Sequence, residues 1–395
     1  MQLNTDLYKM ISKAQITEQL PEIRTWYEHL HAHPEPSFQE KETAAYIASG
    51  LKKMGLEVHR LPQNAVMGYL QATNAIGTIG LRAELDALPL HEQTNVNYIS
   101  QNTGTMHACG HDLHMACALG AAKLLSAHKA NLKHNVLFVF QHAEEKIPGG
   151  AVAVIASDFF KSHKPDVMLA MHSFPDLKAG EVGFRSGPYM ASGDEVDVHI
   201  KGPGGHAAMP HKTVDTVLTA GQVLVALQQI QSRFIPTEIP SVLTFGNICA
   251  ESVMNIIPRE VLLEGTFRTM NEKWRKKALK QIKQIVQNTA KATGADAETV
   301  IRPGYPTIEN DKNVTAKIEN IATKLLGSKN IHLLPLRMTT DDFGYYAQKI
   351  PSAYFRLGVA DSNGRSAGLH TPEFLPDPKA LETGVSLLVQ IIQNY

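Results

Sequence analysis

Cysteine is scarce in this sequence. Cys109, Cys117 and Cys249 are the only three among 395 residues. An odd count without a regular spacing argues against a fold built on disulfide bonds, as small secreted domains are. Reduced thiols and a cytoplasmic protein are therefore the expectation.

Long apolar runs and an excess of charge are also missing. No run of about 18 apolar residues, the length that spans a bilayer, occurs in the chain. Residues 1–15 include no apolar run as long as that of a signal peptide. Lys and Arg together number 38, as do Asp and Glu, so no global field attracts nucleic acid or an anionic membrane. We expect neither as a partner, and specificity must come from a local site.

The first half of the chain alternates helical and strand patterns. Residues 39–55 place Thr43, Ile47 and Leu51 at helical spacing and end on Gly55. Short apolar runs typical of strands follow at residues 78–86, 135–141 and 167–172, and a helical pattern at 114–128 separates the first two. Strands that alternate with helices predict a mixed, mostly parallel sheet covered by helices on both faces.

The pattern changes near residue 187. Residues 194–201 alternate apolar and polar side chains, as a strand with one face in water does. After it we expect a helix at about 213–233, strands at 241–250 and 259–270, a helix at about 271–293 and a strand near 298–302. This β-α-β-β-α-β order is the ferredoxin-like split motif. Because the chain exceeds the roughly 250 to 300 residues of one core, we predict an α/β domain of residues 1–186 and 303–395, with an inserted α+β domain of residues 187–302.

One short segment is unusually rich in groups that bind metals. The sequence MHACGHDLHM, residues 106–115, contains three histidines, one cysteine and one aspartate. A thiolate at Cys109 and an imidazole at His111, on a glycine-containing loop before a helix, can both turn toward one metal ion. The alternative is a set of polar loop histidines beside a buried thiol.

Further ligand types stand where predicted strands end. Asp86, the adjacent pair Glu144 and Glu145, and His172 all lie at such positions. Ligands of open α/β sheets bind outside the carboxyl ends of the strands, so one cleft would collect these side chains with those of residues 109 and 111. Of two adjacent carboxylates, one can coordinate a metal while its neighbour accepts a proton from water. Each group alone is more often solvated or in an ion pair, but their convergence favours a metal site.

The motifs together resemble a known family. RAELDALP, MHACGHDLH, HAEE, MHSFP, GPGGHAAMPH and LHTPEF, in this order and spacing, closely resemble the dinuclear-metal aminoacylase and carboxypeptidase family. Within it they are most similar to the branch of hippurate hydrolases, auxin-conjugate amidohydrolases and N-acetyl-diaminopimelate deacetylases. The similarity runs from residue 30 to the last helical segment, so it covers nearly the whole chain.

The resemblance implies roles for individual residues. It implies two divalent ions, of zinc, manganese, cobalt or nickel, and a hydroxide that bridges them and attacks an amide carbonyl. Glu144 matches the general base of the branch. Asp86 matches an aspartate that orients a metal-binding histidine in relatives, but here Glu84 stands in that histidine's place. The metal ligands of the branch fall on Cys109, His111, Glu145, His172 and His370.

The resemblance also assigns functions to the inserted domain. In the family this domain forms a lid and a dimer interface, so we expect a homodimer. His206 and Asn255 match residues that bind the oxyanion and the substrate, and Arg268 matches an anchor for the substrate carboxylate. A guanidinium fork suits a carboxylate independently of any resemblance. The substrate would be an N-acyl-amino acid such as hippurate or N-acetyl-diaminopimelate.

Substrate preference remains open at two departures from the branch. Residues 146–151 read KIPGGA where a glycine run is usual, and Asp341 replaces a usual glutamate. Peptide hydrolysis of the dipeptidase or aminopeptidase kind at the same site is one alternative. A catalytically inert binding relative is another, although no ligand and no base is missing.

Other chemistries have weaker support. GRSAG, residues 364–368, matches the G-x-S-x-G pattern around Ser366, but no helical run follows it. GPGGHAA, residues 202–208, follows an alternating strand and not the apolar strand that a dinucleotide loop requires. The lysines of residues 271–287 are explained as the wet face of an amphipathic helix.

Overall fold

The chain forms two compact units. The computed structural model describes residues 11–395. The first unit extends through Gly187 and includes residues 309–335 and 342–395, and the second comprises residues 188–308 and 336–341. The short segment 336–341 joins the second unit although no sequence pattern distinguishes it from its neighbours. Within residues 11–395 no helix combines the length and the apolar character needed to span a membrane.

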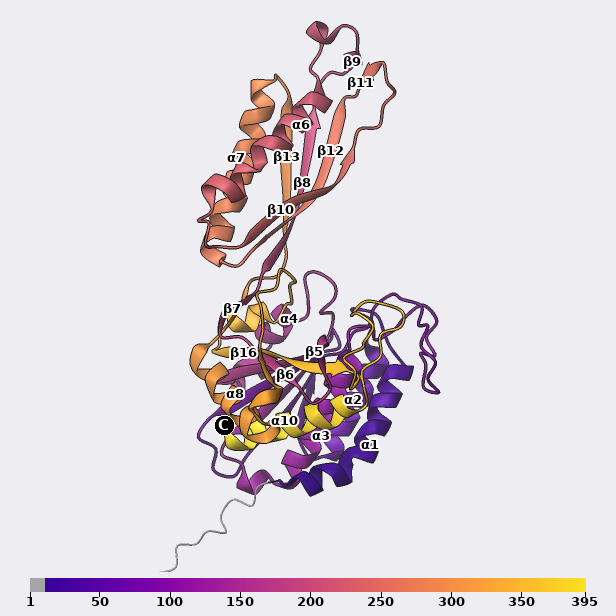
Figure 1. Ribbon diagram of the computed structural model, residues 1–395, viewed down its shortest axis with the longest axis vertical. Helices are drawn as coiled ribbons and strands as arrows, with labels where there is room; N and C mark the ends of the chain where they lie inside the picture. The colour runs from indigo at the N-terminus through magenta and orange to yellow at the C-terminus, as the bar shows by residue number, and fades with distance from the viewer. Residues whose placement is uncertain (1–10) are drawn as a thin grey trace, which may run out of the picture. The chain divides into compact units, whose positions relative to one another are not determined.

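The first unit is built on a mixed sheet of eight strands (Figure 1). In spatial order these are β1 (Glu57–Arg60), β2 (Val66–Leu70), β4 (Asn135–Gln141), β3 (Thr78–Glu84), β5 (Val167–Lys178), β16 (Ser352–Ala360), β6 (Val182–Phe184) and β15 (Ile331–Leu333). The central pairs β4–β3, β3–β5 and β5–β16 are parallel. Every residue of β16 is buried, as expected for a strand covered on both faces. The predicted mostly parallel sheet is confirmed.

Helices of the first unit cover this sheet. The long ones are α1 (Lys13–Ala32), α2 (Lys41–Lys53), α3 (His111–Ala127), α8 (Lys312–Leu326) and α10 (Lys379–Asn394), and the short ones are α4 (Ala151–Ala156), α5 (Asp158–Ser162) and α9 (Gly344–Ala347). Single 3-10 turns are η1 (Lys129–Asn131) and η4 (Ser328–Asn330).

Helix α3 lies in the middle of this unit. It packs between α1 and α10 and contacts β3, and nearly all of its residues are buried. A helix that is apolar on all sides is a core helix. Its N-terminus is set by Gly110, whose φ of 83° is left-handed and whose Cβ, if present, would lie 2.3 Å from Ser173 Oγ. Glycine at this position therefore places the first residue of α3, His111, deep inside the unit.

The second unit has the predicted ferredoxin-like topology. Its four antiparallel strands lie in the order β10 (Ser241–Cys249), β12 (Glu260–Thr269), β8 (Ser192–Lys201) and β13 (Asp296–Pro303). Helices α6 (Thr216–Leu227) and α7 (Glu272–Ala292) pack on this sheet. Val196, Val198 and Ile200 of β8 are fully buried, which confirms the alternating pattern.

The predicted helix at 213–233 differs at both ends. It begins at Thr216 because the side chain of Asp215 accepts a hydrogen bond from Leu218 N and caps the helix. Its end is a separate π-helical turn, η3 (Ile230–Phe234). The remaining elements are the 3-10 turn η2 (Pro210–Lys212), a ribbon of β9 (Gly205–His206) with β11 (Ile256–Ile257), and a ribbon of β7 (Gly187–Met190) with β14 (Ile308–Asn310).

Candidate metal centre

Six side chains with metal-binding or acid–base chemistry meet at one edge of the first unit's sheet. β3, β4 and β5 are parallel, so the residues beyond the carboxyl ends of β3 and β4 lie near His172 of β5. His172 lies two residues past the last pair of β5 with β3, and the strand predicted to end there continues to Lys178. The start of α3 faces the same edge, and a loop between β16 and α10 adds the last residue. The six are Cys109, His111, Glu144, Glu145, His172 and His370.

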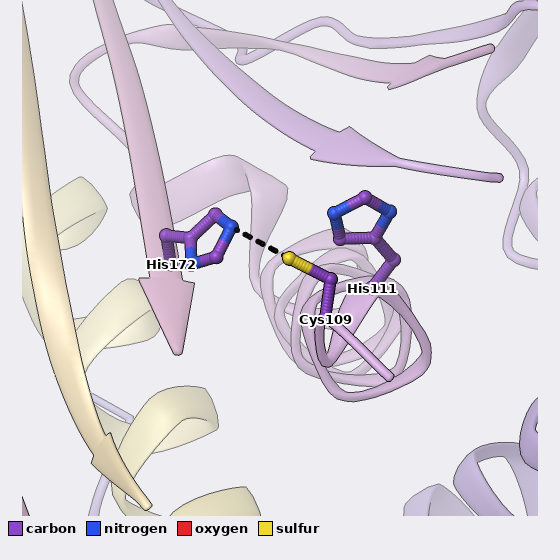
Figure 2. Close-up of side chains that lie close together, drawn as sticks. All are labelled: Cys109, His111 and His172. Carbon is purple, nitrogen blue, oxygen red and sulfur yellow. Dashed lines mark hydrogen bonds between the residues drawn. The ribbon is translucent and has the colours of Figure 1, made fainter. Parts of the chain in front are cut away.

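The cysteine is central to the group. Cys109 Sγ lies 3.5 Å from His172 Nε2 and 3.3 Å from His370 Nε2. Figure 2 shows the thiol pointing from the start of α3 toward the ring of His172 on β5, with the ring of His111 beside it. His370 Nε2 also lies 3.3 Å from Glu145 Oε1. One thiol is thus within reach of ligands from three separate parts of the chain.

Potential ligand atoms fall into overlapping groups within 4.8 Å of one another. One group contains Cys109, His111 and His172, and another contains Cys109, Glu145 and His370. A third contains His111, Glu144 and Glu145. All five ligands and the base expected from the resemblance therefore lie together, although closeness alone does not assign their roles.

The hydrogen bonding of His111 provides a test of whether a cation fits. Its Nδ1 lies 2.8 Å from the carbonyl oxygen of Asp86, so Nδ1 carries a proton, and in the neutral ring that binds a metal Nε2 carries the lone pair. That Nε2 is 3.9 Å from Glu145 Oε1. Among the described residues both atoms are buried and make no hydrogen bond, although Glu145 Oε1 also lies 3.3 Å from His370 Nε2. Two facing acceptors are satisfied by a cation, and a set of sulfur, nitrogen and oxygen donors suits a transition metal.

His172 is oriented in the same manner. Its Nδ1 lies 2.9 Å from the carbonyl oxygen of Ser173, which leaves the lone pair of Nε2 directed at the thiol. Burial and the charge of Arg356 hold the pKa of His172 well below its usual value. The ring is therefore neutral, which is the form that binds a metal.

The electrostatics of the group favour a cation. Burial raises the pKa of the Cys109 thiol well above its usual range, and the charges of Glu145 and Glu144 raise it further. Burial lowers the pKa of His111, but its hydrogen bond to Asp86 and the charges of Glu84, Asp86 and Glu145 outweigh burial and raise that pKa to about 10. Nearby carboxylates contribute to both shifts and, in the absence of an ion, favour a proton on the thiol and on the His111 ring. A bound cation would take the place of these protons.

Asp86 holds two of the expected ligands in place through hydrogen bonds. Its Oδ2 accepts hydrogen bonds from Ser37 Oγ at 2.7 Å and from Glu145 N at 3.0 Å. Its own carbonyl oxygen, and not its carboxylate, makes the short contact with His111 Nδ1. Asp86 is fully buried and acts here as a positioning group for two of the expected ligands.

Glu84 has partners of its own within the unit. It stands at the position where the resemblance implies a metal-binding histidine in wider relatives. Its carboxylate pairs with Arg82 and with His114 Nδ1, the latter at 2.8 Å. His114 Nε2 in turn accepts a hydrogen bond from Ser173 N at 2.8 Å. Arg82 also contacts Asp342 Oδ1 at 2.8 Å. Sequence reasoning missed this network, although a charged residue inside the apolar strand 78–86 was the signal for it.

The three remaining site residues belong to the second unit. His206 and Asn255 lie together at the exposed ribbon of β9 and β11, where Ala207 N donates to the carbonyl oxygen of Asn255. Arg268 on β12 is half-buried and donates from Nη1 to the carbonyl oxygen of Met338 at 3.1 Å. Burial lowers the pKa of Arg268.

Ser366 does not have the surroundings of a hydrolytic nucleophile. It lies in a loop between β16 and α10, and its hydroxyl is 3.0 Å from the carbonyl oxygen of Ala367. The strand-to-helix turn that a nucleophile elbow requires is missing at this position.

Comparison with known proteins identifies what the chain resembles. The profile of peptidase family M20/M25/M40 matches residues 80–394. An N-acetyldiaminopimelate deacetylase of Limosilactobacillus fermentum is 35% identical over 95% of this chain and 97% of its own length. An N-acyl-L-amino acid amidohydrolase of Geobacillus stearothermophilus is 37% identical over 76% of this chain and 83% of its own length. The crystal structure of a dinuclear-metal-binding peptidase of the M20 family from Bacillus subtilis superimposes with a TM-score of 0.81 at 29% identity, covering 96% of this chain and 100% of that one.

Proposed function

Because this chain belongs to peptidase family M20/M25/M40, we propose that it is a metal-dependent amidohydrolase that cleaves the amide bond of N-acyl-amino acids. The observation that carries this proposal is the pair of facing, buried acceptors, His111 Nε2 and Glu145 Oε1, with the carboxylate of Glu144 beside them. The relatives that act on acylated amino acids support the substrate class. The identity of the acyl group stays open.

The residues that would hold two divalent ions are the five expected from the sequence. Cys109 would be the common member of the set, because it lies in one group with His111 and His172 and in another with Glu145 and His370. Zinc, manganese, cobalt and nickel all accept this mixture of sulfur, nitrogen and oxygen donors. Bound ions of this kind supply Lewis acidity, which polarises a carbonyl and lowers the pKa of water. The ligands are Cys109, His111, Glu145, His172 and His370.

Proton transfer falls to Glu144. Its side chain is buried beside Glu145, where it can take a proton from the attacking water and return it to the nitrogen of the leaving amine. Asp86 holds the peptide nitrogen of Glu145 and so keeps this ligand in place. The remaining contacts come from the second unit, in which His206 and Asn255 would stabilise the oxyanion and Arg268 would bind the substrate carboxylate. Arg268 suits this role because its guanidinium has several N–H groups beyond the one bonded to Met338.

We propose that the second unit is also the lid and dimerisation domain, of about residues 187–302, in a cytoplasmic homodimer. The outer face of α6 exposes Val217, Leu218 and Val225, which are 50%, 58% and 75% exposed. β10 lies at the end of its sheet and pairs only with β12 among the described strands, so its other edge is free for a strand of a second copy. The cytoplasmic assignment is supported by three free cysteines.

Turnover of a panel of N-acyl-amino acids tests the function. We expect hydrolysis of acetylated or aroylated amino acids, and loss of about 10³-fold or more in kcat for Glu144→Gln with unchanged metal per chain. Faster turnover of dipeptides with a free amine would favour the peptidase alternative. Metal-loaded protein that hydrolyses none of these substrates would favour the inert relative. Turnover by Glu144→Gln equal to that of the wild type would exclude Glu144 as the base.

Light scattering tests the oligomeric state. Val225→Arg would place a charge on the apolar face of α6 and should convert the dimer to a monomer. A wild-type protein that is monomeric at micromolar concentration would contradict the dimer.

A further inference from the structure

The residues on both sides of Glu144, Ala143 and Glu145, have their N–H groups held by buried carboxylates. Ala143 N donates to Glu40 Oε1 at 2.7 Å, and Glu145 N donates to Asp86 Oδ2 at 3.0 Å. The backbone that carries the base is therefore fixed immediately before and immediately after it. Only the second of these carboxylates belongs to the motifs discussed above.

Ala143 needs such a support. Its φ is 49°, in the left-handed region that residues with a Cβ atom rarely occupy. A strained residue of this kind persists where its surroundings over-determine it, and such residues cluster at functional sites. Ala143 is fully buried, and its N–H donates to the carboxylate of Glu40.

Glu40 is not in its place to cap a helix. It occupies the N-cap position of α2, yet its side chain makes no capping hydrogen bond, and Glu is not among the residues preferred there. Its Oε1 instead accepts from Phe38 N at 2.9 Å and from Ala143 N across the unit. The residue is fully buried, and burial raises its pKa to about 7. Burying a carboxylate here costs free energy, and its hydrogen bonds to Phe38 N and Ala143 N offset part of that cost.

The same short segment supports the second carboxylate. Ser37 Oγ donates to Asp86 Oδ2 at 2.7 Å, so residues 37–40 reach both flanks of Glu144. Glu40 acts directly through Ala143, and Ser37 acts through Asp86.

We propose that Glu40 is a positioning residue that fixes the backbone at Ala143 and thereby aims the carboxylate of Glu144 at the reacting water. This inference rests on the proposed function, in which Glu144 is the general base. Glu40 itself touches neither substrate nor metal ligand. Its removal should therefore reduce the rate of proton transfer while substrate binding and metal content stay close to those of the wild type.

Three variants test this role against a matched control. Glu40→Ala removes the acceptor, Glu40→Asp withdraws it by one methylene, and Glu40→Gln keeps an oxygen at the same distance. The control is Glu35→Ala, because Glu35 also accepts two backbone hydrogen bonds, from Glu42 N and Thr43 N, but holds only the start of α2. Measurements are kcat, KM, metal per chain, and hydrogen exchange of the segment 142–146 in metal-free protein.

We expect kcat to fall by about 10- to 100-fold in Glu40→Ala and Glu40→Asp, with KM within about twofold. Glu40→Gln should recover most of the rate, and Glu35→Ala should resemble the wild type. Exchange of residues 142–146 should accelerate in the first two variants only. If Glu40→Ala does not fold, Glu40→Asp decides the question.

Glu40→Asp with wild-type kcat and unchanged exchange at 142–146 would overturn the inference. Rate losses of equal size in Glu40→Asp and Glu35→Ala would overturn it as well, because they would indicate a general effect on α2. A wild-type protein that hydrolyses no substrate would instead contradict the proposed function. Exchange at 142–146 would then still test whether Glu40 fixes this backbone.

Discussion

Two clusters of histidine and carboxylate groups adjoin the start of α3, and they are built from the same residue types. One is the candidate metal centre around His111. The other is formed by His31 of α1, Asp112 of α3 and Glu92, with His31 Nδ1 2.6 Å from Asp112 Oδ2 and His31 Nε2 3.0 Å from Glu92 Oε1. The side chains of this His31 cluster are 1%, 1% and 2% exposed, as deeply buried as His111, whereas His370 of the metal centre is 51% exposed.

The clusters differ in whether each polar atom has a partner. Both ring nitrogens of His31 face a carboxylate, so the ring is a protonated cation between two anions. Burial opposes this charge, but the hydrogen bonds to Asp112 and Glu92 outweigh burial and raise the pKa of His31 to about 9. At His111, Nδ1 donates to a backbone carbonyl, and Nε2, 3.9 Å from Glu145 Oε1, makes no hydrogen bond among the described residues. We call the His31 cluster closed, because both ring nitrogens are paired, and the cluster around His111 open, because Nε2 makes no hydrogen bond. The closed cluster stabilises the fold, whereas the open cluster can bind an ion.

The largest expected effect comes from removing the shared ligand of the open cluster. Cys109→Ala should lower metal per chain and reduce turnover by at least about 100-fold, because a sulfur ligand within reach of four other expected ligands is lost. Elemental analysis and kinetics measure the two effects. The control is Cys117→Ala, since Cys117 is a buried thiol of α3 that contacts the carbonyl oxygen of Leu381 and none of the expected metal ligands. Equal metal content in both variants would place the ion elsewhere.

Removing His31 from the closed cluster should lower the free energy of unfolding. His31→Ala removes the cation and leaves Asp112 and Glu92 buried with no opposite charge between them, which should cost roughly 3–5 kcal/mol in the free energy of unfolding. Urea denaturation measures this cost. His29→Ala is the control, because His29 is a half-buried ring of the same helix that stacks on Tyr46 without a carboxylate partner among the described residues. Equal free energies of unfolding for His31→Ala and His29→Ala would contradict a stabilising role of the closed cluster.

The sequence predicted the open cluster better than the closed one. Site residues such as Asp86 and His172 end apolar runs of the sequence, and the rule that parallel strands meet at one edge brings them together without knowledge of side-chain packing. Glu40 and His31 do not follow an apolar run, so no sequence pattern singles them out. They reach Ala143 and Asp112 across separations of 103 and 81 residues, and those contacts depend on how α1 and α2 pack on the sheet. The strands and helices followed from periodicity, while the early end of α6 depends on a local turn that periodicity does not describe.

The smallest predicted effect is a pH dependence confined to the closed cluster. Because the pKa of His31 is raised in the folded protein, the folded state holds this proton more tightly than the unfolded chain, whose histidine titrates near 6.5. The stabilisation is complete below about pH 6.5 and is lost as the pH rises through about 9. The free energy of unfolding of the wild type minus that of His31→Ala should therefore fall by about 3 kcal/mol across this window. Urea titrations in chelator at pH 6, 7.5 and 9 measure the difference without a contribution from bound metal. A difference that stays constant across the window would mean that His31 is neutral. The His31 cluster would then not be a cation between two carboxylates, and the contrast with the His111 cluster would fail.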